Sequence, residues 1–152
     1  MKFILDALFP ENSPEKSAEF TEKQLHLATA ALLVEVAAID RVFDEAELEH
    51  LQTLLEDKFS LTHSETQQLI DEAKSASSDS SSLYEFTKHI NEQLNEQEKI
   101  KLVEGLWEIA YADQTLDKHE EHIIRRIADL IHVRHIDFIR TKNAVRDKTQ
   151  NQ

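Results

Sequence analysis

The feature that most constrains this chain is an acidic pattern that occurs once in each half of the sequence. Each copy has the order Asp-x-x-x-Asp-x-x-Glu, and the copies run from Asp40 to Glu47 and from Asp113 to Glu120. One further acid precedes each copy at the same distance, Glu35 in the first and Glu108 in the second. A chain that repeats itself in this way predicts two similar structural units, one after the other.

The residues around both copies favour long helices. The 152 residues contain one Gly and two Pro, which is too few turn formers for a protein of many short strands. Apolar residues recur at helical spacing on most sides of the stretch from about Thr21 to Asp40, which is typical of a buried central helix. We therefore predict an all-α fold, a bundle of about seven or eight helices built from two pseudo-symmetric repeats.

The predicted domain organisation is one helical domain over residues 1–147. It contains a first repeat at about 21–76, a serine-rich polar linker at 75–82, a second repeat at about 83–147, and a frayed tail at 148–152. Residues 1–9 have a one-sided apolar pattern but are too short to hold a helix alone in water. We expect this segment to dock on its own domain, on a partner chain or on a membrane surface.

Four short patterns predict helix starts, because an N-cap side chain and an acid three residues later can satisfy each other's backbone N–H groups. They are Asp44-Glu-Ala-Glu47, Thr62-His-Ser-Glu65, Ser82-Leu-Tyr-Glu85 and Asn95-Glu-Gln-Glu98. The only glycine, Gly105, falls inside the second long helix, where Leu32 stands in the first repeat. A glycine there costs about 1 kcal/mol relative to alanine, which indicates a close helix crossing.

Charge and composition exclude several classes of function. The formal net charge of −13 disfavours nucleic acid and anionic lipid as partners and favours basic ones. No apolar run is long enough for a spanning helix, so we expect no direct membrane insertion. The chain has no cysteine, which excludes thiolate nucleophiles and Cys-ligated zinc and suits a cytoplasmic protein.

The acids of the two patterns have two interpretations. Asp44 and Asp117 can cap the helices that follow, with Glu47 and Glu120 reaching back from the third helical position. Such a reciprocal cap stabilises by about 1 kcal/mol and needs no ligand. The acids that open each pattern, Asp40 and Asp113, are different, because they fall at a helix C-terminus where the helix dipole disfavours negative charge.

A hard divalent cation, Ca²⁺ or Mg²⁺, would compensate these charges, since both ions take carboxylate and carbonyl oxygens as ligands. The candidate ligands are Asp40, Asp44, Glu47, Asp113, Asp117 and Glu120, with Glu35 and Glu108 as second choices. The pattern is not an EF-hand, since the twelve-residue loop with its central glycine is missing. Arg41 can neutralise Asp40 in the first turn, whereas Gln114 stands in the second, so if only one half binds an ion we expect it to be the second.

The histidines do not form a catalytic constellation. His119 and His122 are three residues apart, not the four of a zinc-protease helix. Glu47 and His50 match the Glu-x-x-His spacing of paired-metal bundles, but the equivalent of His50 is Ile123. We predict no catalytic residues and no enzyme; a metal-dependent enzyme is the third hypothesis, after a cation-binding module and a scaffold whose acids only cap helices.

Two motif pairs resemble those of the tellurite-resistance protein B (TerB) family, over about residues 20–147. They are Ala38-Ile-Asp40 with Asp44-Glu-Ala-Glu47, and Tyr111-Ala-Asp113 with Asp117-Lys-His-Glu120. The family often has Ala-Asp-Gly at the turn, whereas Arg41 and Gln114 stand in place of the glycine here. Among its relatives is a domain of a membrane-anchored DnaJ-type co-chaperone, and this chain looks like a stand-alone bacterial branch.

The resemblance implies an all-helical fold, acids proposed to bind metal, and no established catalysis. It also implies links to stress responses and to membrane-associated complexes. We therefore expect a non-enzymatic binding or adaptor module with a protein partner, and we predict no particular oligomeric state.

Overall fold

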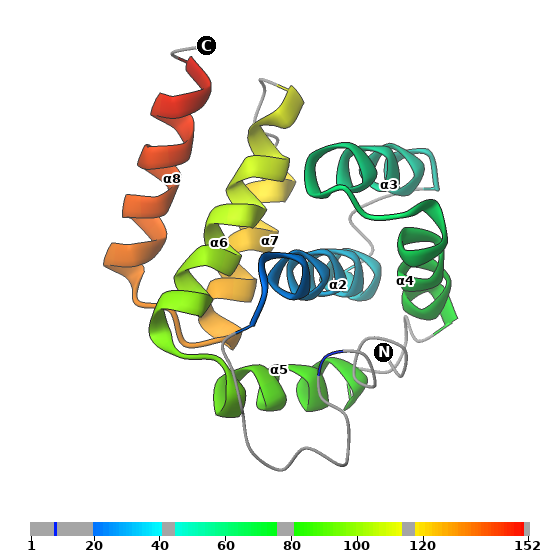
Figure 1. The fold of residues 1–152 in the computed structure, drawn as a ribbon, viewed down its shortest axis with the longest axis horizontal. Coiled ribbons are helices and arrows are strands. Elements are labelled where there is room, and N and C mark those ends of the chain that lie inside the picture. The colour runs from blue at the N-terminus through cyan, green and yellow to red at the C-terminus, as the bar shows by residue number, and fades with distance from the viewer. Residues whose placement is uncertain (1–7, 9–19, 41–44, 76–80, 114–117, 151–152) are drawn as a thin grey trace.

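The computed structural model describes residues 8, 20–40, 45–75, 81–113 and 118–150 of the chain. These residues form seven α-helices and one 3₁₀ helix, and no strand occurs among them (Figure 1). The elements are α2 (Glu22–Asp40), α3 (Glu45–Phe59), α4 (His63–Ser75), α5 (Ser81–Gln93), α6 (Glu96–Ala110), η1 (Tyr111–Asp113), α7 (Lys118–Leu130) and α8 (His135–Gln150). The all-α prediction is confirmed.

The helices follow the predicted internal repeat closely. Helices α2, α3 and α4 correspond in order to α6, α7 and α8, and α5 joins the two sets. The second helices begin at Glu45 and Lys118, which are equivalent positions of the two acidic patterns. After each second helix one residue adopts left-handed backbone geometry, Ser60 with φ 55° and His132 with φ 60°. A left-handed turn therefore follows the second helix of each repeat, with His132 one position before the exact equivalent of Ser60.

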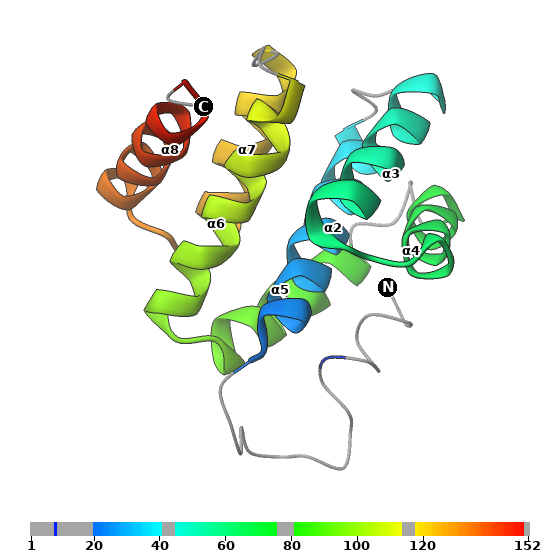
Figure 2. The same ribbon diagram turned by 45° about the horizontal axis from the view of Figure 1, so that its top comes forward.

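Helix α2 lies at the centre of the bundle. Figures 1 and 2 show α3 and α4 on one side of it and α6, α7 and α8 on the other. The first helix of each repeat packs against the second helix of the other, since α2 contacts α7 and α6 contacts α3. Each repeat also packs its third helix on its first, α4 on α2 and α8 on α6. This reciprocal packing agrees with the predicted pseudo-two-fold arrangement.

Apolar residues on nearly every side of α2 explain its central place. They are buried against neighbouring helices, and each large one contributes about 1.5–3 kcal/mol of hydrophobic stabilisation. The side chains of α2 that are at most 2 % exposed include Ala30, Ala31, Leu32, Val34, Val36 and Ala37. Alanines among them let the other helices approach closely.

Local capping explains where several helices begin. At α4 the Thr62 N–H donates to Glu65 Oε1 at 2.9 Å, and the Glu65 N–H donates to Thr62 Oγ1 at 3.1 Å. Asn95 and Glu98 form the same reciprocal box at α6. The predicted starts at Thr62 and Asn95 are thus confirmed. Helix α5 begins at Ser81, so Ser82 lies inside the helix and not at its cap.

The glycine of the second long helix does mark a helix crossing. A Cβ atom on Gly105 would lie 3.3 Å from Phe59 Cζ of α3 and 3.3 Å from Thr29 Cγ2 of α2. Three helices therefore converge on this position, and a side chain there would displace its neighbours.

The structure departs from the predicted boundaries near the linker and the C-terminus. Helix α8 continues to Gln150, so the frayed tail predicted from Lys148 does not hold for residues 148–150. The buried Val145 and the bond from Thr149 Oγ1 to the Val145 carbonyl, at 2.9 Å, hold this last part of the helix. Helix α4 includes Ser75 and α5 begins at Ser81, which shortens the predicted linker.

The N-terminal prediction lies outside the described residues except for Leu8, which is buried. Among the helices that are described, none combines the length and the apolar character needed to cross a bilayer.

Candidate functional site

The six predicted metal ligands lie around the connections from the first to the second helix of each repeat. Asp40 is the last residue of α2, and Asp113 is the last residue of η1. Asp44 and Asp117 directly precede α3 and α7 in the sequence but lie outside the described residues, as do the side chains of Asp40 and Asp113. Within the described part of the chain, no three His, Asp or Glu side chains gather into a metal-binding group. The complete ligand sets remain predictions.

The two glutamates that close the acidic patterns have different surroundings. Glu47 on α3 is exposed, whereas its equivalent on α7, Glu120, is half-buried. Glu120 lies beside the core residues Leu33 and Ile124, and its Oε2 atom is buried. One carboxylate oxygen of Glu120 is thus buried beside the second turn, whereas the side chain of Glu47 beside the first turn is exposed.

The second-choice ligands also differ, although they are equivalent in the repeat. Glu35 is only 2 % exposed within the central helix. Burying a carboxylate costs free energy unless partners compensate its charge, so the packing around α2 must stabilise this side chain. Glu108 is exposed on the outer face of α6. The internal repeat therefore keeps the acid at this position but not its environment.

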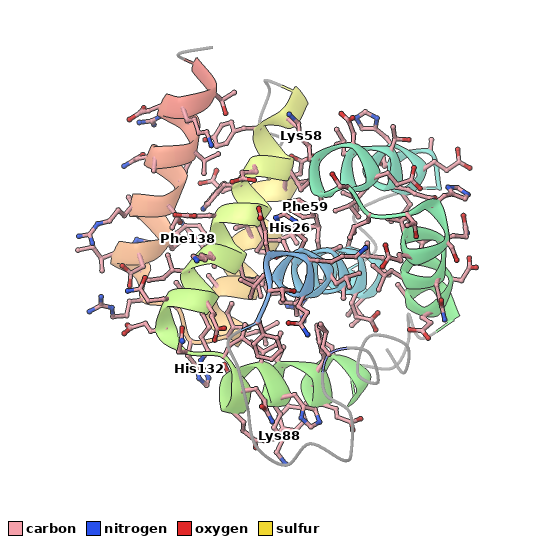
Figure 3. The ribbon with its side chains drawn as sticks, in the orientation of Figure 1. His26, Lys58, Phe59, Lys88, His132 and Phe138 are labelled. Carbon is pink, nitrogen blue, oxygen red and sulfur yellow. The ribbon has the colours of Figure 1, made fainter. Side chains whose placement is uncertain are left out.

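A cleft of about 400 Å³ lies where α2 crosses α6, and sequence analysis did not predict it. Its α2 side includes Phe20, Leu25, His26 and Thr29, and its α6 side is formed by Lys101, Glu104, Gly105 and Glu108. Next to the cleft, the His26 ring stacks on Phe59 of α3, with ring centroids 4.3 Å apart and planes 7° from parallel. Figure 3 shows both rings, with Lys58 nearby, in the central region where α2, α3 and α6 meet.

A smaller hollow of about 280 Å³ continues the surface past Glu108, which lines both spaces. Lys58 from the end of α3 and Lys148 from the end of α8 line this second hollow. The two spaces thus carry opposite charge: acids predominate in the first, and two lysines face Glu108 in the second.

Among the acids that line the cleft, Glu104 has a pKa that its surroundings shift. Burial, followed by the negative charge of Glu108, raises the pKa of Glu104 above its ordinary value, while Lys101 and Lys148 act in the opposite direction. Both effects penalise the carboxylate form.

The family model described as tellurite resistance protein TerB matches residues 26–143 of the chain. This protein belongs to the TerB family. The matched range covers both acidic turns and most of the described helices, and it confirms the resemblance found in the sequence motifs. Comparison with curated proteins gave no match, and neither did comparison with solved structures.

This TerB domain therefore contains two distinct features. One is the pair of acidic turns that the sequence predicts. The other is the cleft between α2 and α6, for which the chain did hold a signal. At matched positions α2 has Ala31 and Leu32 where α6 has Glu104 and Gly105. A position-by-position comparison of the repeats points to this face of α6, because one repeat keeps it apolar and the other does not.

Proposed function

We propose that this TerB-family protein is a non-enzymatic binding module that holds Ca²⁺ or Mg²⁺ at its acidic turns. The observation that supports it best is the matched position of the two turns. Each joins the first and second helices of a repeat, and the helices after the turns begin at the equivalent residues Glu45 and Lys118. All three acids of the pattern recur, while the residues between Asp40 and Asp44 differ completely from those between Asp113 and Asp117.

The chemistry of these positions suits a hard cation. Each pattern offers three carboxylates close together in the sequence. The end of a helix adds backbone carbonyls that have no partner within the helix, together with the negative end of the helix dipole. Carboxylate and carbonyl oxygens are the ligands of Ca²⁺ and Mg²⁺. The inward-directed Glu120 and the absence of an arginine at position 114 favour the second turn as the stronger site.

The proposal also includes a basic protein partner and a cellular role as an adaptor. The net charge of −13 favours a basic protein surface as the partner. Family resemblance supports a cytoplasmic adaptor in a stress response, including one that acts at membrane-associated complexes. In this proposal the bound ion sets the charge and shape of the turns that the partner meets.

Titration of isotopically labelled protein with Ca²⁺ and with Mg²⁺, followed by NMR, tests the proposal directly. We expect amide shifts concentrated at residues 40–47 and 113–120. The double variant Asp113→Asn, Asp117→Asn should remove the shifts at the second turn. Asparagine caps helices about as well as aspartate, so this change removes charge while it spares a cap. Glu85→Gln with Glu92→Gln on α5 is the matched control, since it removes the same charge from exposed positions elsewhere.

The alternative function is a protein-interaction scaffold in which the acids only cap helices. A specific observation favours it: the Thr62–Glu65 and Asn95–Glu98 patterns of this chain are closed by capping bonds between the paired residues. Spectra that stay unchanged in excess Ca²⁺ and Mg²⁺ would support the scaffold and contradict the cation proposal.

A further inference from the structure

The two repeats use one helix face in opposite ways. On α2 the face that includes Ala28, Ala31 and Leu32 is buried, with at most 3 % of any of these side chains exposed. The equivalent face of α6 carries Lys101, Glu104 and Gly105, and it opens into the 400 Å³ cleft. Gly105 lets α6 pack closely against Thr29 and Phe59 at the helix crossing, so the α6 wall of the cleft has no counterpart of the Leu32 side chain.

The cleft places acids from two helices around one space. Glu104 and Glu108 are four residues apart on α6 and so lie next to each other on the helix surface. Glu22 lines the same cleft from the start of α2, and its Oε1 is 3.9 Å from His26 Nε2. Lys101 lines the same cleft, and Lys148 acts on Glu104 from the neighbouring hollow, so these two lysines offset part of the negative charge. Glu104 is half-buried, whereas Glu22 and Glu108 are exposed, and the combined negative charge of the three carboxylates attracts a cation.

The remaining wall of the cleft combines apolar and aromatic side chains with the polar Thr29 and Lys101. Phe20 and Leu25 contribute hydrocarbon surface, and the His26 ring is held in place by its stack on Phe59. Small-molecule sites combine hydrocarbon surface with a few convergent polar groups, and a volume of about 300–1,000 Å³ is typical. A bare metal ion would gain no binding free energy from contact with Phe20 and Leu25, whereas an aliphatic chain would gain hydrophobic stabilisation there.

We propose that this cleft binds an alkylammonium group: an ammonium near Glu104 and Glu108, followed by a methylene chain against Phe20 and Leu25. Such a group has two sources, a free linear diamine or the lysine side chain of a basic protein segment. The acidic field of the whole molecule draws either of them toward the cleft. This site is separate from the acidic turns, and its occupation does not require a metal ion.

The test uses the full chain and two probes, the diamine cadaverine and N-acetyl-lysine amide, with calorimetry and NMR as readouts. We expect saturable binding, with amide shifts near His26, Gly105 and Glu108. Replacing Glu104 and Glu108 together by glutamine should weaken binding about tenfold or more. Both side chains keep their size and lie at the surface of α6, and circular dichroism checks that the variant is folded. Stronger binding of one probe identifies the source of the ammonium group.

Two controls separate specific binding from general attraction to an acidic protein. Glu85→Gln with Glu92→Gln removes two charges from α5, outside the cleft lining, and should leave cadaverine binding unchanged. Pentanol, which has the chain without the charge, should bind much more weakly. If the α5 variant loses as much affinity as the cleft variant, or if pentanol binds equally well, the proposal is wrong. The Asp113→Asn, Asp117→Asn protein should still bind cadaverine, so this outcome is independent of the cation proposal.

Discussion

Glu98 Oε2 accepts a hydrogen bond at 2.9 Å from the backbone N–H of Phe20, a residue 78 positions earlier in the chain. The other oxygen of the same carboxylate, Oε1, accepts from the Asn95 N–H, also at 2.9 Å. One buried side chain thus caps α6 and holds the segment that leads into α2. This bond ties together the beginnings of the long helices of both repeats.

Replacing Glu98 should therefore cost more than the loss of an ordinary helix cap. Glutamine keeps one acceptor oxygen but places an NH₂ group against a backbone N–H, and we expect a loss of about 1–3 kcal/mol in the free energy of unfolding. The comparison is Gln24→Ala, which removes the local bond from the Thr21 N–H to Gln24 Oε1, keeps the bond from the residue 24 N–H to Thr21 Oγ1, and should cost about 1 kcal/mol or less. Urea unfolding followed by circular dichroism measures both. Equal losses would show that the bond to Phe20 contributes little.

Substitutions at Gly105 should separate helix propensity from packing. Alanine gains about 1 kcal/mol of helix propensity but brings its Cβ within 3.3 Å of Phe59 and Thr29, so we expect a small net loss of stability. Leucine, the residue of the first repeat, adds much more volume and should cost roughly 2 kcal/mol or more by overpacking. Thermal unfolding of the two variants checks the order. A leucine variant as stable as the parent would mean that the crossing can widen freely.

The hydrogen bonds of Glu56 at the α3–α4 contact should make the free energy of unfolding depend on pH. Glu56 Oε1 accepts a bond from Thr66 Oγ1 at 2.7 Å and lies 2.8 Å from His63 Nδ1. These bonds lower the pKa of Glu56 below its ordinary value. The carboxylate therefore stabilises the folded state above its ordinary pKa, and this contribution is lost as pH falls through the lowered value.

A Glu56→Gln variant should accordingly lose less stability than the parent between about pH 7 and pH 3. Urea unfolding at several pH values in this range gives the comparison. Glu49→Gln, a change at an exposed acid of the same helix, is the control and should follow the parent. Parallel curves for the parent and Glu56→Gln would contradict the assignment.

Cation binding at the turns should appear as added stability. A ligand that binds only the folded state at about 100 times its Kd raises the free energy of unfolding by about 2.7 kcal/mol. We expect this gain with Ca²⁺ or Mg²⁺ and its loss when EDTA is added. Asp113→Asn with Asp117→Asn should remove more of the gain than Asp40→Asn with Asp44→Asn, because Arg41 already supplies a positive charge in the first turn. Thermal unfolding measures each effect, and the reverse order would contradict the preference for the second turn.

Local sequence signals predicted much of this fold because the interactions behind them are local. A cap such as Thr62 with Glu65 joins residues three apart, so it can be found without knowing the tertiary structure. The repeat was visible for a similar reason, since matched acids and matched helix periods lie in the sequence itself. The last turn of α8 was missed because its order depends on burial of Val145 beside other helices.

Sequence patterns are enough to predict the helical class, the two repeats, several caps and the positions of the acidic turns, because helix period and capping act over a few residues. Tertiary packing sets the burial of Glu35, the exposure of Glu108 and the depth of the cleft beside the α6 face around Gly105. Equivalent positions received different environments because burial depends on which distant segment covers a helix face. Comparison of Ala31 and Leu32 with Glu104 and Gly105 shows that the α6 face is less apolar, but packing between helices decides whether a cleft forms there.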